Sequence, residues 1–214
     1  MPRLDRRRLL PLLAAAPLAA PSAAARAEGA GLERARRRAA ALERLHALVV
    51  VQDGATVLAE AFRGHALDRP VNVKSVSKTI VATLAGIALD RGVLTGVDQP
   101  VAPLLGPLVP AGADPRVEAI TVGHLLTMQA GLERTSGANY GGWVQSGNWV
   151  ADALARPFVA EPGARMLYST GSYHLLAVAL ARAAGRDLLG LARDWLGAPL
   201  GAAIPPWTRD PQGY

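Results

Sequence analysis

The feature that most limits the fold of this chain is a shortage of strands. Residues 46–62, HALVVVQDGATVLAEAF, contain two short β-rich runs on either side of Asp53-Gly54, a dipeptide that accepts the positive φ angles of a tight hairpin turn. No other segment of the 214 residues is a convincing strand. An isolated hairpin is only marginally stable in water. The sequence therefore predicts an α+β fold whose antiparallel sheet is incomplete, with an N-terminal hairpin only, beside a mostly helical region.

Helical patterns account for most of the remaining chain. Apolar residues recur at helical spacing in five segments, which we predict as helices: residues 32–45, 79–89, 121–132, 172–184 and 187–196. The helix at 79–89 is expected to be buried on most sides, because apolar residues dominate it. Residues 93–118 are rich in Pro and Gly and predict an irregular connection, and the Gly, Ser and aromatic residues of 134–149 predict a loop.

The first 27 residues are typical of a signal peptide. A basic stretch precedes an apolar run from Leu9 to about Ala20, and small residues follow around Ala27. The three arginines at positions 6–8 favour the twin-arginine route. The apolar run is shorter than the roughly 20 residues of a membrane-spanning helix. We therefore expect a single domain at 28–214 that is periplasmic or secreted, without stable membrane insertion.

Composition removes several classes of function. Cleavage after Ala27 would take away five arginines and one aspartate, which lowers the formal charge from +6 to +2, so no nucleic-acid partner is expected. With no cysteine, the chain has neither a thiolate metal site nor a cysteine nucleophile. The four histidines are scattered and form no His-Glu-x-x-His motif, so neither a metal nor another cofactor is expected. Oligomeric state stays open.

Both lysines of this arginine-rich chain lie close to one serine. Of the 23 basic residues only Lys74 and Lys78 are lysine, and Ser75 lies between them in VNVKSVSKTI. Lys78 comes one helical turn after Ser75, so its amine can approach the serine hydroxyl. A lysine can take a proton from serine when its surroundings lower its pKa, whereas arginine stays protonated. We predict that Ser75 is a nucleophile and Lys78 its base; a helix N-cap followed by a surface lysine is the alternative.

Ser75 opens the first of three stretches that carry a resemblance to a known family. They are SVSKTIVATLAGIALDRG, ITVGHLLTMQAGL and EPGARMLYSTGSYHLLAVAL. In this order they resemble the serine β-lactamase-related hydrolases, which include class C β-lactamases, DD-peptidases and esterases, and most closely the branch with 6-aminohexanoate-dimer hydrolases. The resemblance runs from about residue 40 to the last residue and implies a β-lactamase/DD-peptidase-like fold.

The resemblance also implies roles for residues outside the Ser-x-x-Lys motif. Tyr168, in YST, takes the place of the tyrosine that moves a proton between the serine and the leaving group in such enzymes. Thr170 stands where many relatives have an asparagine that helps to position the substrate, which favours a general amidase or esterase over a strict β-lactamase. Tyr140 is expected to face the substrate from the 134–149 stretch; a buried loop anchor is its alternative.

A third element of the family, a Lys-Thr-Gly or His-x-Gly triplet, is absent, because no lysine follows Lys78 and no histidine stands two positions before a glycine in that region. We therefore expect a chain that is truncated at its C-terminus. The predicted function is an exported serine hydrolase that cleaves an amide or ester bond of a small molecule through an acyl-serine intermediate. The alternative is a catalytically inactive truncated member of the same fold, or one that only binds its ligand.

Overall fold

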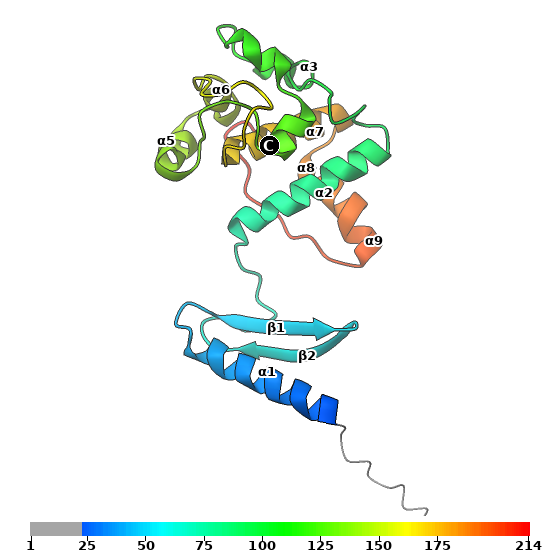
Figure 1. Ribbon diagram of the computed structural model, residues 1–214. Helices are drawn as coiled ribbons and strands as arrows, with labels where there is room; N and C mark the ends of the chain where they lie inside the picture. Colours follow the sequence, from blue (N-terminus) through cyan, green and yellow to red (C-terminus); the bar gives the residue numbers. More distant parts are fainter. Residues whose placement is uncertain (1–22) are drawn as a thin grey trace, which may run out of the picture. The chain divides into compact units, whose positions relative to one another are not determined.

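The computed structural model describes residues 23–214, with side chains from residue 29 onward (Figure 1). The chain divides into two compact units, of which the first ends at Val71 and the second comprises Asn72–Tyr214. The predicted signal peptide up to residue 22 lies outside the described residues. No helix within residues 23–214 is long and apolar enough to cross a bilayer.

The first unit contains one helix and the predicted hairpin. Helix α1 spans Ala23–Ala41, so the helix expected at 32–45 begins and ends earlier than the pattern indicated. The guanidinium of Arg63 donates hydrogen bonds to the carbonyl oxygens of Ala40 and Leu42. Ala40 lies in the last turn of α1, where carbonyl groups lack an intrahelical partner, so Arg63 satisfies one of them.

The hairpin itself is confirmed. Strands β1 (Ala47–Gln52) and β2 (Ala55–Ala61) pair antiparallel. Asp53 and Gly54 have φ angles of 49° and 78°, the positive values that a two-residue hairpin turn requires. The register shifts between Val50 and Val51. Together with the helices, this two-stranded sheet confirms the α+β class.

The second unit is a series of helical elements joined by turns and longer loops. In chain order they are η1 (Lys74–Val76), α2 (Ser77–Asp90), α3 (Ala102–Leu105), η2 (Gly106–Leu108), η3 (Pro115–Ala119), α4 (Val122–Leu126), η4 (Gly137–Asn139), α5 (Tyr140–Gln145), α6 (Trp149–Leu154), α7 (Thr170–Ala184), α8 (Leu188–Ala192), the π-helical turn η5 (Arg193–Gly197) and α9 (Ala198–Leu200). The helices predicted at 79–89, 121–132, 172–184 and 187–196 are therefore present, although the second stops at Leu126.

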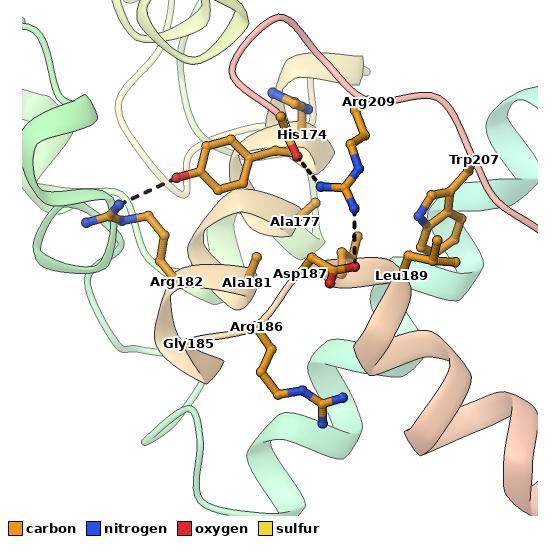
Figure 2. Close-up of a pocket in the computed structure, with 13 residues that line it drawn as sticks. His174, Ala177, Ala181, Arg182, Gly185, Arg186, Asp187, Leu189, Trp207 and Arg209 are labelled. Atoms are coloured by element: carbon orange, nitrogen blue, oxygen red, sulfur yellow. Dashed lines mark hydrogen bonds and ion pairs between the residues drawn. The ribbon is translucent and has the colours of Figure 1, made fainter.

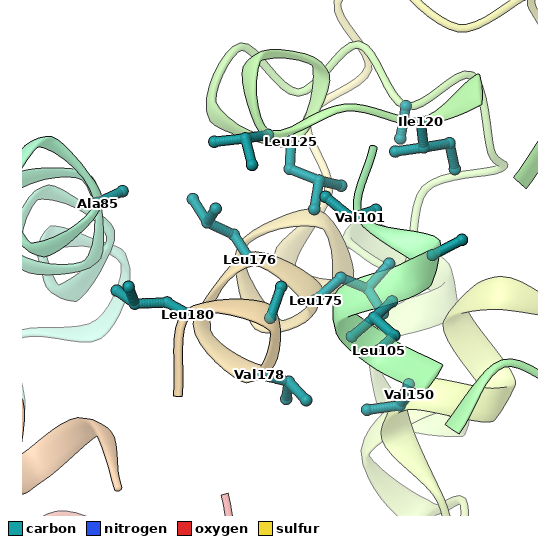
Figure 3. Close-up of a cluster of buried hydrophobic side chains, with 14 of the residues drawn as sticks. Ala85, Val101, Leu105, Ile120, Leu125, Val150, Leu175, Leu176, Val178 and Leu180 are labelled. Atoms are coloured by element: carbon teal, nitrogen blue, oxygen red, sulfur yellow. The ribbon is translucent and has the colours of Figure 1, made fainter. Parts of the chain in front are cut away.

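Helix α7 is the centre of the core. It packs against α2, α3, α4, α6 and α8, and its Leu175, Leu176 and Leu180 are at most 1% exposed. Figure 3 shows Leu180 extending from α7 toward α2, which carries Ala85. Burial of each such leucine contributes roughly 1.5–3 kcal/mol to stability. The chain entering α7 is therefore held at a fixed place.

Two expectations from the sequence differ in part from the structure. Helix α2 is fully buried at Leu84, Ala85 and Ala88, and Ile80, Val81 and Leu89 pack partly buried against the same core. Its burial on most sides therefore holds, except for an exposed strip that contains Thr83 and Gly86.

The stretch 134–149 is also more regular than the predicted loop. It contains α5 and leads directly into α6. The side chain of Trp143 in α5 is 1% exposed, and its ring centroid lies 4.8 Å from that of Trp149. This burial gives a short, glycine-containing helix the tertiary anchor that its composition does not suggest.

Candidate active site

Ser75 and Lys78 meet at the junction between η1 and α2. Lys78 Nζ donates a hydrogen bond to Ser75 Oγ over 3.2 Å. Ser75 is exposed and Lys78 is half-buried. The serine hydroxyl is thus open to a ligand on one side and in contact with an amine on the other.

The residue before the serine has an uncommon backbone conformation. Lys74 has a φ of 50°, in the left-handed region that costs energy for any residue with a Cβ. Its N–H donates to Asn72 Oδ1 over 2.8 Å, and its carbonyl oxygen accepts from Ser77 Oγ, also over 2.8 Å. These two bonds hold the turn that places Ser75 at the start of the helix. The Lys74 side chain is exposed.

Tyr168 joins this pair from a segment 90 or more residues away. Lys78 Nζ lies 5.3 Å from the centroid of the tyrosine ring. A hydrogen bond with Ser75 lowers the pKa of the Tyr168 phenol below its ordinary value; partial burial opposes this shift, and the positive charge of Lys78 adds to it. Three side chains expected in the site, Ser75, Lys78 and Tyr168, are therefore brought together.

The residues that hold Tyr168 in place were not predicted from the sequence. Four hydroxyl side chains form what we call the hydroxyl bridge: Thr135, Ser136, Ser169 and Thr170. The N–H groups of Thr170 and Gly171, at the start of α7, donate to Ser136 Oγ over 2.9 Å and to Thr135 Oγ1 over 2.7 Å. The helix thus receives its N-terminal cap from another segment, because the Ser169 side chain does not cap it.

The hydroxyl bridge continues at the residue next to Tyr168. Ser169 Oγ accepts from the N–H of Thr135 over 3.1 Å and lies 3.2 Å from Thr135 Oγ1. Gly171 permits this close approach, since a Cβ there would lie 3.0 Å from the Thr135 side chain. Thr135 is 1% exposed and Ser169 5%. Tyr168 is therefore attached to a buried and hydrogen-bonded backbone.

A second set of bonds supports the chain that leads to Tyr168. The N–H of Leu167 donates to the carbonyl oxygen of Met128 over 2.8 Å, and that of Gly163 donates to Gln129 over the same distance. Leu132 and Phe158 form an antiparallel bridge. Residues 128–133 and 157–168 therefore run together, and the tyrosine lies at the end of this paired region.

Two further predicted site residues have other contacts. Thr170 Oγ1 lies 3.0 Å from Ser136 Oγ, so its hydroxyl belongs to the hydroxyl bridge. Tyr140 is 49% exposed at the start of α5, with its ring centroid 6.1 Å from that of Trp143. The structure does not bring either side chain into contact with Ser75, and their roles in substrate binding stay predictions.

The histidines of the helices have structural partners. His124 Nδ1 accepts from the N–H of Thr121 over 3.3 Å and so caps α4. His174 Nε2 lies 2.9 Å from Asp210 Oδ2, and burial lowers the pKa of His174 despite the opposing effect of this carboxylate. Within residues 23–214 no three His, Asp or Glu side chains are grouped so that they could hold a metal ion.

Two cavities bear on the position of the site. One, of about 400 Å³, is lined by Tyr168 and by residues of the paired region. The other, of about 470 Å³, lies between the end of α7, the 185–189 turn and residues 207–214, and none of the three candidate catalytic residues lines it. Figure 2 shows the guanidinium of Arg209 directed toward Asp187 in this second cavity, where the two side chains approach to 3.7 Å. Of the two cavities, the smaller one adjoins the site through Tyr168.

Solved structures share this arrangement of the chain. SurE with D-Leu is 28% identical, with a TM-score of 0.61 over 87% of this chain and 42% of that one. The hydrolase EstCE1 is 24% identical, with a TM-score of 0.62 over 84% and 53%. A penicillin-binding protein homologue from Pyrococcus abyssi is 24% identical, with a TM-score of 0.62 over 81% and 43%. The chain spans about half the length of these structures, and the last two likenesses show the fold alone.

A search of curated proteins gave no match. The family model described as Beta-lactamase, however, matches residues 24–213, which is most of the chain. The match includes both units and all three residues that meet at the Ser75 hydroxyl. The chain therefore belongs to the beta-lactamase family.

Proposed function

We propose that this chain carries the nucleophile, base and proton shuttle of a serine hydrolase that cleaves an amide or ester bond through an acyl-serine intermediate. The observation that carries this proposal is the meeting of two groups at one hydroxyl. Lys78 Nζ is 3.2 Å from Ser75 Oγ, and the phenol of Tyr168, with its lowered pKa, interacts with the same oxygen. A serine hydroxyl with two possible proton acceptors is an activated nucleophile.

The proposed reaction has two halves. Ser75 Oγ attacks the carbonyl carbon while its single proton passes by way of Lys78 to Tyr168, and the carbonyl oxygen becomes an oxyanion. Tyr168 then returns the proton to the leaving nitrogen or oxygen as the bond between it and the carbonyl carbon breaks. In the second half, water attacks the acyl carbon and gives a proton to the same groups. The bond between the acyl carbon and Ser75 Oγ then breaks, the proton passes to Oγ, and the acid is released. The backbone N–H of Ser75 is one proposed donor to the oxyanion.

Within this class we propose an amidase or esterase related to the 6-aminohexanoate-dimer hydrolases. The three sequence stretches that include Ser75, Leu126 and Tyr168 support this branch. Thr170 supports it too, because its hydroxyl is already bonded to Ser136, and it has no amide group to orient a lactam. We also propose that the protein is exported, as its first 27 residues suggest.

The test compares two hydroxyls of the same region. Ser75→Ala removes the proposed nucleophile, whereas Thr83→Ala removes an exposed hydroxyl of α2 that donates only to the Thr79 carbonyl. Hydrolysis of 4-nitrophenyl esters and 4-nitroanilides is measured for both variants. We expect Ser75→Ala to lose turnover and Thr83→Ala to keep most of it. Equal rates for wild type and Ser75→Ala would refute the proposal.

A further inference from the structure

We propose that helix α1 attaches the first unit to the surface of a bilayer that contains anionic phospholipids. Four arginines fall within the five residues 34–38 of this helix. Three of them, Arg34, Arg37 and Arg38, form what we call the basic stripe. The attachment is peripheral, because the guanidiniums contact lipid phosphates and the helix stays outside the hydrocarbon. This inference goes beyond the proposed hydrolysis and uses none of the candidate catalytic residues.

The first argument is the side of α1 on which the basic stripe lies. Arg36 Nη2 donates to Glu60 Oε1 of β2 over 3.1 Å, and Ala39 is 4% exposed, so this side of the helix packs on the hairpin (Figure 1). At about 100° per residue, Arg34 and Arg38 each lie about 160° around the helix from Arg36. Both are exposed. The stripe therefore faces away from the hairpin.

The second argument is that the charges of the basic stripe are poorly neutralised. Among the described residues, no carboxylate lies within ion-pair distance of Arg34 or Arg38. Arg37 has Glu33 at 4.0 Å, and this carboxylate is shared with Arg36, at 3.9 Å. Exposed pairs of this kind contribute little. The stripe therefore presents nearly its full positive charge to the solvent.

The third argument is that a plane of phosphates fits this arrangement better than a small anion does. The basic stripe lies on the convex surface of a helix, and Arg34 and Arg38 are about 6 Å apart along its axis. A convex surface does not enclose a small anion, so a single phosphate would meet only one or two guanidiniums. The closely spaced phosphates of a bilayer can meet all three, and each basic residue near an anionic lipid surface adds to the attraction.

An exposed leucine favours lipid over nucleic acid as the source of the phosphates. Leu42 comes one turn after Arg38, and its N–H donates to the carbonyl oxygen of Ala39 over 3.1 Å, which continues the turn past the end of α1. Its side chain is 53% exposed. In a bilayer, acyl chains lie just below the phosphates and can take up such a side chain, whereas a nucleic-acid backbone has no apolar layer. The stripe also begins seven residues after the predicted cleavage at Ala27, close to the membrane that an exported chain crosses.

The experiment measures co-sedimentation of the purified protein with two kinds of vesicle, one of equal parts phosphatidylglycerol and phosphatidylcholine and one of phosphatidylcholine alone. At about 0.01 M salt we expect wild type to bind the anionic vesicles at least tenfold more tightly, and at about 1 M salt, where the Debye length is about 3 Å, to lose this preference. The double variant Arg34→Gln/Arg38→Gln should bind the anionic vesicles about tenfold or more weakly than wild type does. Arg186→Gln/Arg209→Gln is the matched control, because it removes the same net charge at two ion-paired arginines of the second unit and should bind as wild type does.

A fluorescent label tests which face of the first unit meets the lipid. The chain has no cysteine, so a single substitution places one label that brightens in apolar surroundings. Ala41→Cys puts the label two turns after Arg34, beside the basic stripe, and Ala59→Cys puts it at an exposed position of β2 on the sheet face opposite to Glu60. We expect only the label at position 41 to brighten with the anionic vesicles.

Neither measurement needs turnover, so each result stands whether or not the proposed hydrolysis is found. Equal binding by wild type and the stripe variant, or an equal loss in the matched control, would overturn the proposal. So would equal affinity for the two kinds of vesicle. Binding to duplex DNA that depends on the stripe, without binding to the vesicles, would assign the stripe to a nucleic acid and overturn it too.

Discussion

Replacement of Thr135 by valine tests whether the hydroxyl bridge positions Tyr168. Valine keeps the size and branching of threonine but cannot accept the bond from the N–H of Gly171, which is 2.7 Å long in wild type. Thr135 is 1% exposed, so water cannot replace the lost acceptor. A buried donor without a partner costs roughly 1–3 kcal/mol, and we expect a loss of about 2 kcal/mol. For a chain of this length the melting temperature would fall by about 4–8 °C.

Thr135→Ser is the matched control, because it keeps the hydroxyl and removes one methyl group at a cost of about 0.8 kcal/mol. Both variants are measured by urea unfolding and by the rate of acylation with a fluorophosphonate. We expect Thr135→Ser to acylate at nearly the wild-type rate and Thr135→Val to be slower under conditions where it is fully folded. Equal losses of stability and rate in the two variants would refute the bridge, because packing alone would then account for both.

Three other perturbations follow from the structure. Lys78→Arg keeps the charge but removes the proton acceptor, so the rate of acylation should fall by about 10²- to 10⁴-fold. Lys74→Arg, at an exposed side chain, should acylate at nearly the wild-type rate. Similar rates for both variants would contradict this role of Lys78. Burial lowers the pKa of His174, so the unfolded chain binds a proton more readily than the folded chain does. The free energy of unfolding should therefore fall as the pH drops below about 6.5. Urea titrations at several pH values should show this fall in wild type and not in His174→Gln. Gly131→Ala would put a Cβ 2.4 Å from a carbonyl oxygen at a φ of 82°, so thermal unfolding should show a loss of roughly 2–5 kcal/mol in the free energy of unfolding. Gly141→Ala, with open space around the new Cβ, should leave that free energy unchanged or raise it.

The contact between Ser75 and Lys78 was predictable because it is local. A spacing of three residues at a helix start brings two side chains to one face whatever the rest of the chain does. Tyr168 has no local relation to them, and only the resemblance of YST to a family motif indicated it. The hairpin was predictable because it is local too, like the contact between Ser75 and Lys78, since Asp53-Gly54 sets the geometry of its own turn.

The hydroxyl bridge could not be predicted from the sequence. Hydrogen bonds between serine and threonine side chains follow no characteristic sequence spacing, and Thr135 and Ser169 are 34 positions apart. Helix α5 was missed because Gly141 and Gly142 are poor helix formers, and the burial of Trp143 outweighs them.

The measurement that tests the central claim most directly is intact-protein mass spectrometry after incubation with a fluorophosphonate. We expect a single adduct on wild type, located by peptide mapping at Ser75, which is lost in Ser75→Ala and forms more slowly in Lys78→Ala. An unlabelled wild-type chain, or an adduct of equal yield in Ser75→Ala, would contradict the account of Ser75 as the activated nucleophile.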